Sequence, residues 1–155
     1  MGAGVPAGAA AVHQRAVGAI GGSIPSAVAA RLASPGGGPV VAVLGDDTAG
    51  FRISELDTAV RYGLPLVAVI GNDARWNAEH LIQLRDFGAD RLVGCGLNRT
   101  RHDLVAAAFG RHGEHVRAAA EPGPALGRAL EAGRPACVNG QIEGAAAPVV
   151  TRAEG

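Results

Sequence analysis

Lysine is absent from the sequence, and neither sign of charge is in excess. All the basic residues are arginines, and the 14 of them balance 14 acidic residues, so the formal net charge at pH 7 is zero. A neutral chain lacks the positive surface that binds nucleic acid or an anionic membrane, and we expect neither partner. No apolar run reaches the ~18 residues of a membrane-spanning helix, and the first residues lack a signal-peptide pattern. We therefore expect a cytoplasmic protein.

Cysteine and aromatic residues are also scarce. The two cysteines, Cys95 and Cys137, show neither CxxC spacing nor a His–Cys pattern. We therefore expect both to be buried small side chains in a reducing compartment. Three Phe, one Trp, one Tyr and 24 glycines leave Ala, Val, Leu and Ile to build the core. With 48% hydrophobic and 18% charged residues in 155 positions, the composition suits one globular domain.

A strand–helix–strand pattern occupies the middle of the chain. Residues 39–44 are apolar and rich in β-branched side chains, which favours a strand that is buried on both faces. Apolar residues at helical spacing follow over 53–62, and residues 65–70 form a second apolar run. This order is typical of a parallel sheet. We also expect strands at 91–94, 115–118 and 136–139, and helices at 25–32, 77–87, 100–109 and 124–131.

The alternation of strands and helices predicts the fold class. We expect an α/β protein with three layers, α/β/α, and a doubly wound, mainly parallel sheet of about five to six strands. The expected domain covers residues 15–144, with tails at 1–14 and 145–155. The sequence contains no internal repeat.

A carboxylate follows each of the two central strands. Asp46 comes after the first strand and Asp73 after the second. Ligands bind beyond the carboxyl ends of parallel strands, and Mg²⁺ prefers one or two carboxylates together with phosphate oxygens. Two neighbouring strand ends could bring both carboxylates to one such ion. The alternative is that each Asp caps the helix that follows it, and spacing alone favours that capping role.

Three ordered blocks carry a family resemblance. Gly45-Asp46-Asp47, with Asp73 of Asn72-Asp73 27 positions after Asp46, resembles the thiamine diphosphate motif, which has Gly-Asp-Gly and then Asn-Asn. Residues 54–65 resemble the helix and the Leu-Pro strand entry between these two elements, and residues 18–27 resemble the glycine-rich segment that precedes them. Over residues 17–142 the chain is similar to the C-terminal diphosphate-binding domain of thiamine diphosphate-dependent enzymes of the acetolactate synthase-like family.

The resemblance implies a set of site residues. The side chains of Asp46 and Asp73 and the backbone carbonyl of Arg75 would bind Mg²⁺. The Gly18 carbonyl would face the aminopyrimidine ring, and Ile20 would be the apolar wedge that holds the cofactor bent. Without the resemblance, core packing would be the favoured explanation for Ile20 and Trp76, and the role of Trp76 stays open. The residues implied to contact thiamine diphosphate are Gly18, Ala19, Ile20, Gly45, Asp46, Asp47, Thr48, Asp73 and Trp76.

Two positions depart from the family pattern. Asp47 stands where the motif has Gly, and its charged side chain would crowd and repel the diphosphate unless it turns outward. Asp73 stands where the motif has Asn, which suits Mg²⁺ but adds repulsion toward the phosphates. We therefore expect an altered site that binds more weakly.

The resemblance also implies an activity that this chain cannot supply alone. It implies decarboxylation or carboligation of a 2-keto acid by a homo- or hetero-oligomer, with the activating glutamate on a separate pyrimidine-binding domain or subunit. No catalytic residue is therefore assigned here. The alternative is a non-catalytic relic or assembly module that keeps the fold, which Asp47 favours. A nucleotide-binding flavodoxin-like domain is less favoured, because no glycine-rich phosphate loop follows the first strand.

Overall fold

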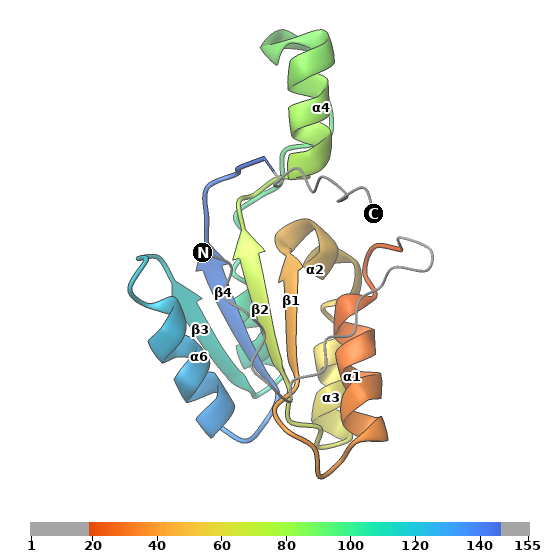
Figure 1. Cartoon of the computed structure of the whole chain (residues 1–155), viewed down its shortest axis with the longest axis vertical. Coiled ribbons are helices and arrows are strands. Elements are labelled where there is room, and N and C mark those ends of the chain that lie inside the picture. Colours follow the sequence, from red (N-terminus) through yellow and green to blue (C-terminus); the bar gives the residue numbers. More distant parts are fainter. Residues whose placement is uncertain (1–18, 147–155) are drawn as a thin grey trace, which may run out of the picture.

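A computed structural model of the chain describes residues 19–146 (Figure 1). Its four strands form one sheet in the order β1-β2-β4-β3, and every pair of neighbours is parallel. The α/β fold with a parallel sheet is therefore confirmed. The elements in chain order are α1 (Ser23–Ala33), β1 (Val41–Gly45), α2 (Asp46–Arg52), α3 (Glu55–Arg61), β2 (Val67–Asn72), α4 (Asn77–Phe87), a 3₁₀ turn η1 (Ala89–Arg91), α5 (His102–Ala108), β3 (His112–Val116), α6 (Pro122–Glu131) and β4 (Ala136–Gln141).

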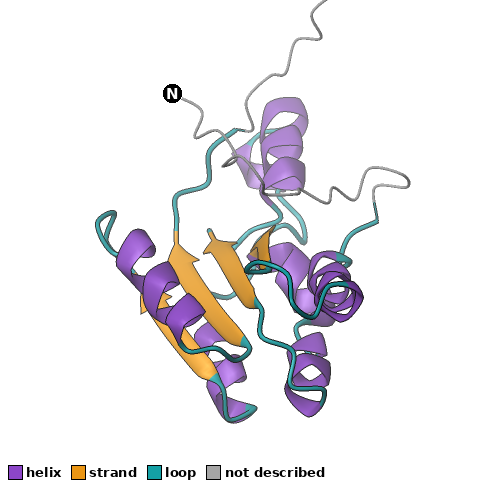
Figure 2. Cartoon of the chain, turned by 60° about the horizontal axis from the view of Figure 1, so that its bottom comes forward, coloured by secondary structure: helices purple, strands orange, loops and turns teal. Residues whose placement is uncertain are grey.

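Helices cover the two faces of the sheet unequally (Figure 2). Alternate strand residues such as Leu44 and Ile70 pack in one core with apolar side chains of α1, α2, α3 and α5. On the opposite face, Val67 and Val138 pack against α6. The face toward α6 is open at the β1 edge, where the side chain of Val43 is 75% exposed. Among the described helices, α6 alone packs against this second face.

The number of strands differs from the expectation of five to six, since the described residues form four. Residues 91–94 were expected to be a strand, but they form the end of the 3₁₀ turn and a loop. The side chain of Gln83 provides the reason, because it binds both backbone polar groups of Val93. Its Nε2 donates to the Val93 carbonyl at 3.1 Å, and its Oε1 accepts from the Val93 N–H at 2.7 Å. No partner strand is needed there.

The helix expected over residues 53–62 is present as α3, and a second helix that was not expected, α2, precedes it. α2 begins at Asp46, directly after β1, and ends at Arg52, and α3 begins at Glu55. At the junction, the N–H groups of Leu56 and Asp57 bond to carbonyls three residues earlier in the chain, as in a tight turn. Because β1 runs straight into α2, Asp46 lies at the very edge of the sheet.

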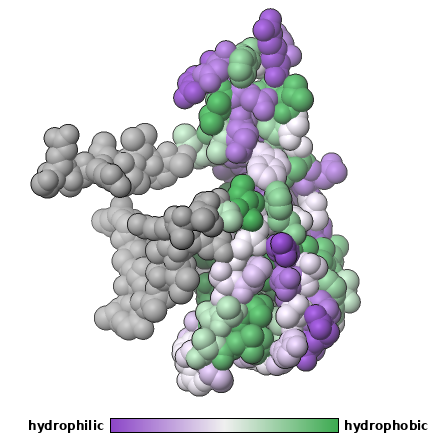
Figure 3. Space-filling model, turned by 90° about the vertical axis from the view of Figure 1, so that its right-hand side faces the viewer, coloured by the Kyte–Doolittle hydropathy of each residue, from purple (hydrophilic) through white to green (hydrophobic). Residues whose placement is uncertain are grey.

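Helix α4 projects from the body of the molecule, at the top of Figure 1. None of its residues is buried, and Ile82, Leu84 and Phe87 are all exposed. Figure 3 shows hydrophobic surface interspersed with hydrophilic surface on this projecting end. No helix within residues 19–146 has the length and apolar character to cross a membrane.

Candidate functional site

The two aspartates that follow β1 and β2 come together at one edge of the sheet. β1 and β2 are in register, with Gly45 opposite Gly71, so the chain leaves both strands at the same level. Asp46 is 4% exposed and Asp73 is 8% exposed. The two carboxyl groups are therefore both buried where β1 and β2 end, at the carboxyl end of the sheet.

The electrostatics of this pair suit a cation. Burial raises the pKa of Asp46 above its ordinary value, and the carboxylates of Asp73 and Asp47 raise it further, while hydrogen bonds from the backbone N–H groups of Asp46 and Asp73 lower it in part. Oδ2 of Asp46 is buried and has no hydrogen-bond partner among the described residues. A buried, unpartnered carboxylate oxygen is costly unless a cation compensates it. The donor set therefore fits a hard divalent ion such as Mg²⁺.

The loop after β2 is held in place by residues 95–97. The N–H of Trp76 donates to the Cys95 carbonyl at 2.9 Å, and the N–H of Leu97 donates to the Ala74 carbonyl at 2.8 Å. These bonds make a short antiparallel bridge with Arg75 at its centre. The loop that carries Asp73 and the Arg75 carbonyl is thereby tied to a segment about twenty residues further along the chain.

Ala74 takes an unusual backbone conformation inside this loop. Its φ of 60° is the one positive value among the described non-glycine residues. The Asn72 side chain supports the turn, because its Oδ1 accepts a hydrogen bond from the Ala74 N–H at 3.2 Å. A left-handed conformation at a residue with a Cβ is rare, and such residues cluster at functional sites.

Asp47 does not extend outward from the site. Its Oδ1 accepts a hydrogen bond from the Thr48 N–H at 2.6 Å. The same oxygen lies over Gly45, where a Cβ at that position would collide with it. The Asp47 carboxylate therefore folds back over the start of α2. It occupies the Thr48 N–H, which is then not free to donate to a diphosphate. The place where the resemblance implies a diphosphate is therefore partly filled by this side chain.

An apolar group lies beside α2. The rings of Phe51 and Trp76 meet edge to face, with centroids 5.6 Å apart and planes 80° apart. Gly21, at φ +85°, approaches the same helix so closely that a Cβ on it would lie 2.8 Å from the Phe51 Cβ. Ile20 precedes it and is 48% exposed. Ala19 is exposed, and Gly18 lies outside the described residues.

Sequence reasoning missed Gly144 and Asn77. A Cβ on Gly144 would lie 2.9 Å from both Oδ2 of Asp73 and Oδ1 of Asn77. Nδ2 of Asn77 also donates to the Ala145 carbonyl at 2.8 Å. The chain after β4 therefore passes directly over Asp73, and a side chain at residue 144 would require the Asp73 and Asn77 side chains to shift. No local pattern signals this, because the contact joins distant parts of the sequence.

A buried polar network borders the site on the β4 side. Nδ2 of Asn139 donates to Oδ1 of Asp103 at 3.2 Å, and Arg101 makes two hydrogen bonds to the same carboxylate, at 2.9 and 2.6 Å. Burial alone would raise the pKa of Asp103, but the hydrogen bonds from Arg101 and Asn139 outweigh it and lower that pKa. Asp103 is therefore a stable anion that anchors the start of α5 to the sheet.

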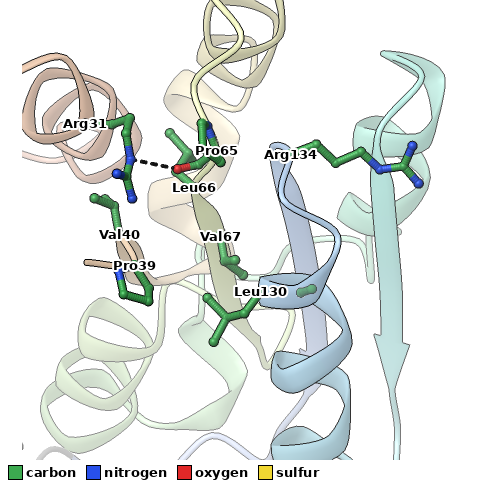
Figure 4. Close-up of a pocket in the computed structure, with 9 residues that line it drawn as sticks. Arg31, Pro39, Val40, Pro65, Leu66, Val67, Leu130 and Arg134 are labelled. Atoms are coloured by element: carbon green, nitrogen blue, oxygen red, sulfur yellow. Dashed lines mark hydrogen bonds between the residues drawn. The ribbon is translucent and has the colours of Figure 1, made fainter. Parts of the chain in front are cut away.

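A separate cavity of about 120 Å³ lies at the opposite end of the sheet, at the amino ends of β1 and β2 (Figure 4). Arg31 and Arg134 lie on opposite sides of it in the figure. Arg31 is 6% exposed and donates to five backbone carbonyls, including that of Pro65 at 3.0 Å and that of Gly38 at 2.7 Å. Its hydrogen-bonding capacity is used within the protein, so it closes the end of α1 rather than binding an anion.

Comparisons with known proteins identify the family of this chain. The family model described as "Thiamine pyrophosphate enzyme, C-terminal TPP binding domain" matches residues 6–139. Acetolactate synthase large subunit IlvG of Mycobacterium tuberculosis is 42% identical over 113 residues, which are 73% of this chain and 20% of that protein. 2-Hydroxyacyl-CoA lyase 2 of Xenopus laevis is 45% identical over 83 residues, 54% of this chain and 12% of that protein. Sulfoacetaldehyde acetyltransferase of Castellaniella defragrans is 34% identical over 110 residues, 71% of this chain and 18% of that protein.

A solved structure shows the same fold. The thiamine diphosphate-dependent 4-hydroxybenzoylformate decarboxylase of Rhodococcus jostii RHA1 superposes with a TM-score of 0.67 at 24% identity, over 80% of this chain and 23% of that one. The matched region covers a fifth or less of the three curated relatives named above. The chain belongs to the family of C-terminal thiamine pyrophosphate-binding domains of thiamine pyrophosphate enzymes.

Proposed function

We propose that this chain is the diphosphate-binding half of an acetolactate synthase-like enzyme that binds thiamine diphosphate through Mg²⁺ and acts on a 2-keto acid. The observation that carries the proposal is the buried Oδ2 of Asp46, which has no partner among the described residues and lies by a second carboxylate, that of Asp73. A buried pair of this kind is destabilising while both groups are ionised, and a bound cation compensates that cost. The family of this domain is the context in which that cation holds a diphosphate.

The proposal gives each residue a separate task. Asp46, Asp73 and the Arg75 carbonyl would hold the ion, and the bridge to residues 95–97 keeps the last two in place. When bound, thiamine diphosphate supplies the electron sink for decarboxylation and carboligation, while the protein supplies position and electrostatics. Ile20 and the Phe51–Trp76 pair would form an apolar wall that excludes water from the site.

A pyrimidine-binding domain or subunit completes the proposed enzyme. It would carry the activating glutamate, so this chain alone would be inactive. The exposed apolar residues of α4 and the uncovered β1 edge support association with such a partner, because large exposed apolar surface favours a protein contact. A cytoplasmic homo- or hetero-oligomer is part of the same proposal.

One observation favours the alternative of a non-catalytic module that keeps the fold. The Asp47 carboxylate already occupies the Thr48 N–H at the start of α2. An anion at that amide competes with a diphosphate both for the hydrogen bond and by charge. Such a module would bind Mg²⁺ weakly and thiamine diphosphate not at all.

Thermal unfolding tests the proposal. The chain is heated with Mg²⁺ and excess thiamine diphosphate, beside Asp46→Ala and the matched control Asp90→Asn, which removes an exposed carboxylate instead. A ligand at ~100 times its dissociation constant stabilises the fold by about 2.7 kcal/mol. We expect a Mg²⁺-dependent rise in the wild type and the control that Asp46→Ala loses. The absence of any rise, both alone and with a pyrimidine-binding chain, would refute the proposal.

A further inference from the structure

A second cavity lies against the base of α4. It has a volume of about 280 Å³ and is lined by Trp76, Glu79, Gln83, Val93, Gly94 and Cys95. Cys95 carries a free thiol and is 4% exposed. Its Sγ lies 3.6 Å from Nδ1 of His80, which belongs to α4. At this distance the imidazole is placed to take the thiol proton when the sulfur attacks.

The other cysteine, Cys137, is not placed to react. Cys137 is fully buried in β4 within the main core. Burial, and to a lesser degree the charge of Asp103, raises the pKa of its thiol to about 12. No histidine within the described residues hydrogen-bonds to it. The chain therefore contains an inert thiol against which Cys95 can be compared.

We propose that Cys95 and His80 form a modification site at which a small disulfide transfers one of its halves to Cys95. The Cys95 thiol gives its proton to His80, and its Sγ attacks one sulfur of the disulfide. A new S–S bond forms to Cys95, the original S–S bond breaks, and the departing thiolate takes the proton from His80. The disulfide is the oxidant: one thiol becomes a mixed disulfide, and one small thiol is released.

The charge of the cavity selects the disulfide. Glu79 is the one charged residue among the six that line it. Its carboxylate attracts a cationic reagent and repels an anionic one. The site therefore prefers a cationic disulfide such as cystamine to an anionic one such as glutathione disulfide.

Modification of Cys95 would also affect the loop that carries Asp73 and Arg75. The Cys95 carbonyl accepts the Trp76 N–H at 2.9 Å, within the bridge that holds Arg75. A group added to a nearly buried sulfur has to displace its surroundings, because protein interiors are close-packed. This part of the inference rests on the proposed function: modification would loosen the loop of Asp73 and so weaken Mg²⁺ binding.

The first experiment compares the two thiols in the full chain. The native protein is incubated with cystamine, and the mixed disulfide at each cysteine is followed over time by peptide mass spectrometry. We expect Cys95 to react at least ~10-fold faster than Cys137 in the native chain, and at an equal rate in denaturant, because the fold creates the difference. Equal rates in the native chain, or a faster Cys137, overturn the proposal.

Two variants test the roles of the neighbours. His80→Asn is expected to slow the reaction of Cys95 several-fold, while His115→Asn on β3 leaves it unchanged. An unchanged rate in His80→Asn contradicts its role as proton acceptor. Glu79→Gln changes an exposed side chain and keeps the test decisive even where His80→Asn does not fold. It should narrow the preference for cystamine over glutathione disulfide, and an unaltered preference contradicts the selection by charge.

Fluorescence provides a readout that needs neither Mg²⁺ nor thiamine diphosphate. Trp76 is the single tryptophan of the chain and lines the same cavity as Cys95. We expect cystamine to change its emission in the wild type, and dithiothreitol to restore it, with no response in Cys95→Ser. A wild type with full modification and unchanged emission contradicts the coupling to the loop. Failure of cofactor binding leaves these results unaffected, so the two proposals fail separately.

Discussion

The side chains of Asn72 and Asn139 hydrogen-bond to each other, with 3.2 Å between Nδ2 of Asn72 and Oδ1 of Asn139. Asn72 ends β2, whereas Asn139 lies within the neighbouring strand β4, opposite Ile70, and each is 1% exposed. Both also donate to the Thr100 carbonyl, at 2.9 and 3.3 Å. This buried amide pair therefore links the end of β2 and the middle of β4 to Thr100, in the segment before α5.

Breaking this pair should destabilise the domain. Asn139→Ala removes the acceptor for Asn72 and a donor to Asp103, and it leaves buried polar groups without partners. We expect a loss of about 1–3 kcal/mol in the free energy of unfolding, measured by urea denaturation. Asn98→Ala, in an exposed loop, is the control and should change the free energy by less than about 0.5 kcal/mol. Equal losses in the two variants would show that the amide pair has no special role.

Asp46 should make the metal-free chain less stable as the pH rises. The pKa of Asp46 is raised in the folded state, so the folded chain binds its proton more tightly than the unfolded chain does. The resulting stabilisation is present at acid pH and is lost as the pH rises from about 4 through the folded pKa. Asp46→Asn should therefore raise the melting temperature by a few degrees at pH 7 but not at acid pH. Scanning calorimetry over this range measures the difference.

At pH 7, added Mg²⁺ should reverse the order of the melting temperatures, so that the wild type melts above Asp46→Asn. The ion stabilises the wild type by binding the ionised carboxylate, whereas Asp46→Asn gains little. Asp90→Asn, which removes an exposed carboxylate, should behave as the wild type in both conditions. If Mg²⁺ raised the melting temperature of Asp46→Asn as much as that of the wild type, the ion would bind elsewhere.

Local patterns in the sequence were sufficient for the main elements. The apolar run at 39–44 predicted β1, and α4 has the expected bounds, residues 77–87. The expected strand at 91–94 was wrong, because one side chain, that of Gln83, binds the backbone polar groups of Val93. A contact of this kind depends on where α4 places Gln83, and no pattern within residues 91–94 indicates it.

The candidate site was also predictable only in part. The positions of Asp46 and Asp73 at one sheet edge followed from the parallel order of two strands and from the family resemblance. The direction of the Asp47 side chain did not, because a carboxylate at a helix start can turn outward or bond to its own backbone. The contact of Gly144 with Asp73 could not be predicted from a local pattern either, since it joins residues 71 positions apart.

Removing the Asp47 side chain should improve cofactor binding. Asp47→Gly frees the Thr48 N–H and removes a negative charge from the start of α2. We expect the affinity for thiamine diphosphate with Mg²⁺ to rise about tenfold, which corresponds to about 1.4 kcal/mol, measured by isothermal titration calorimetry. Asp47→Asn keeps the shape and removes the charge, so it separates the two effects. No gain in either variant would mean that this side chain does not limit binding.

Gly144 should be required for the ion site. A Cβ there would lie 2.9 Å from Oδ2 of Asp73 and 3.4 Å from Nη1 of Arg75, so Gly144→Ala must displace the Asp73 carboxylate or the segment above it. We expect a loss of about 1–3 kcal/mol in unfolding free energy and a smaller Mg²⁺-dependent rise in melting temperature. Gly36→Ala is the matched control, because a Cβ at that position meets nothing within 4 Å. If Gly144→Ala kept the full Mg²⁺ response, the chain after β4 would lie over Asp73 without shaping the site, and the ion would depend on the loop of residues 73–75 alone.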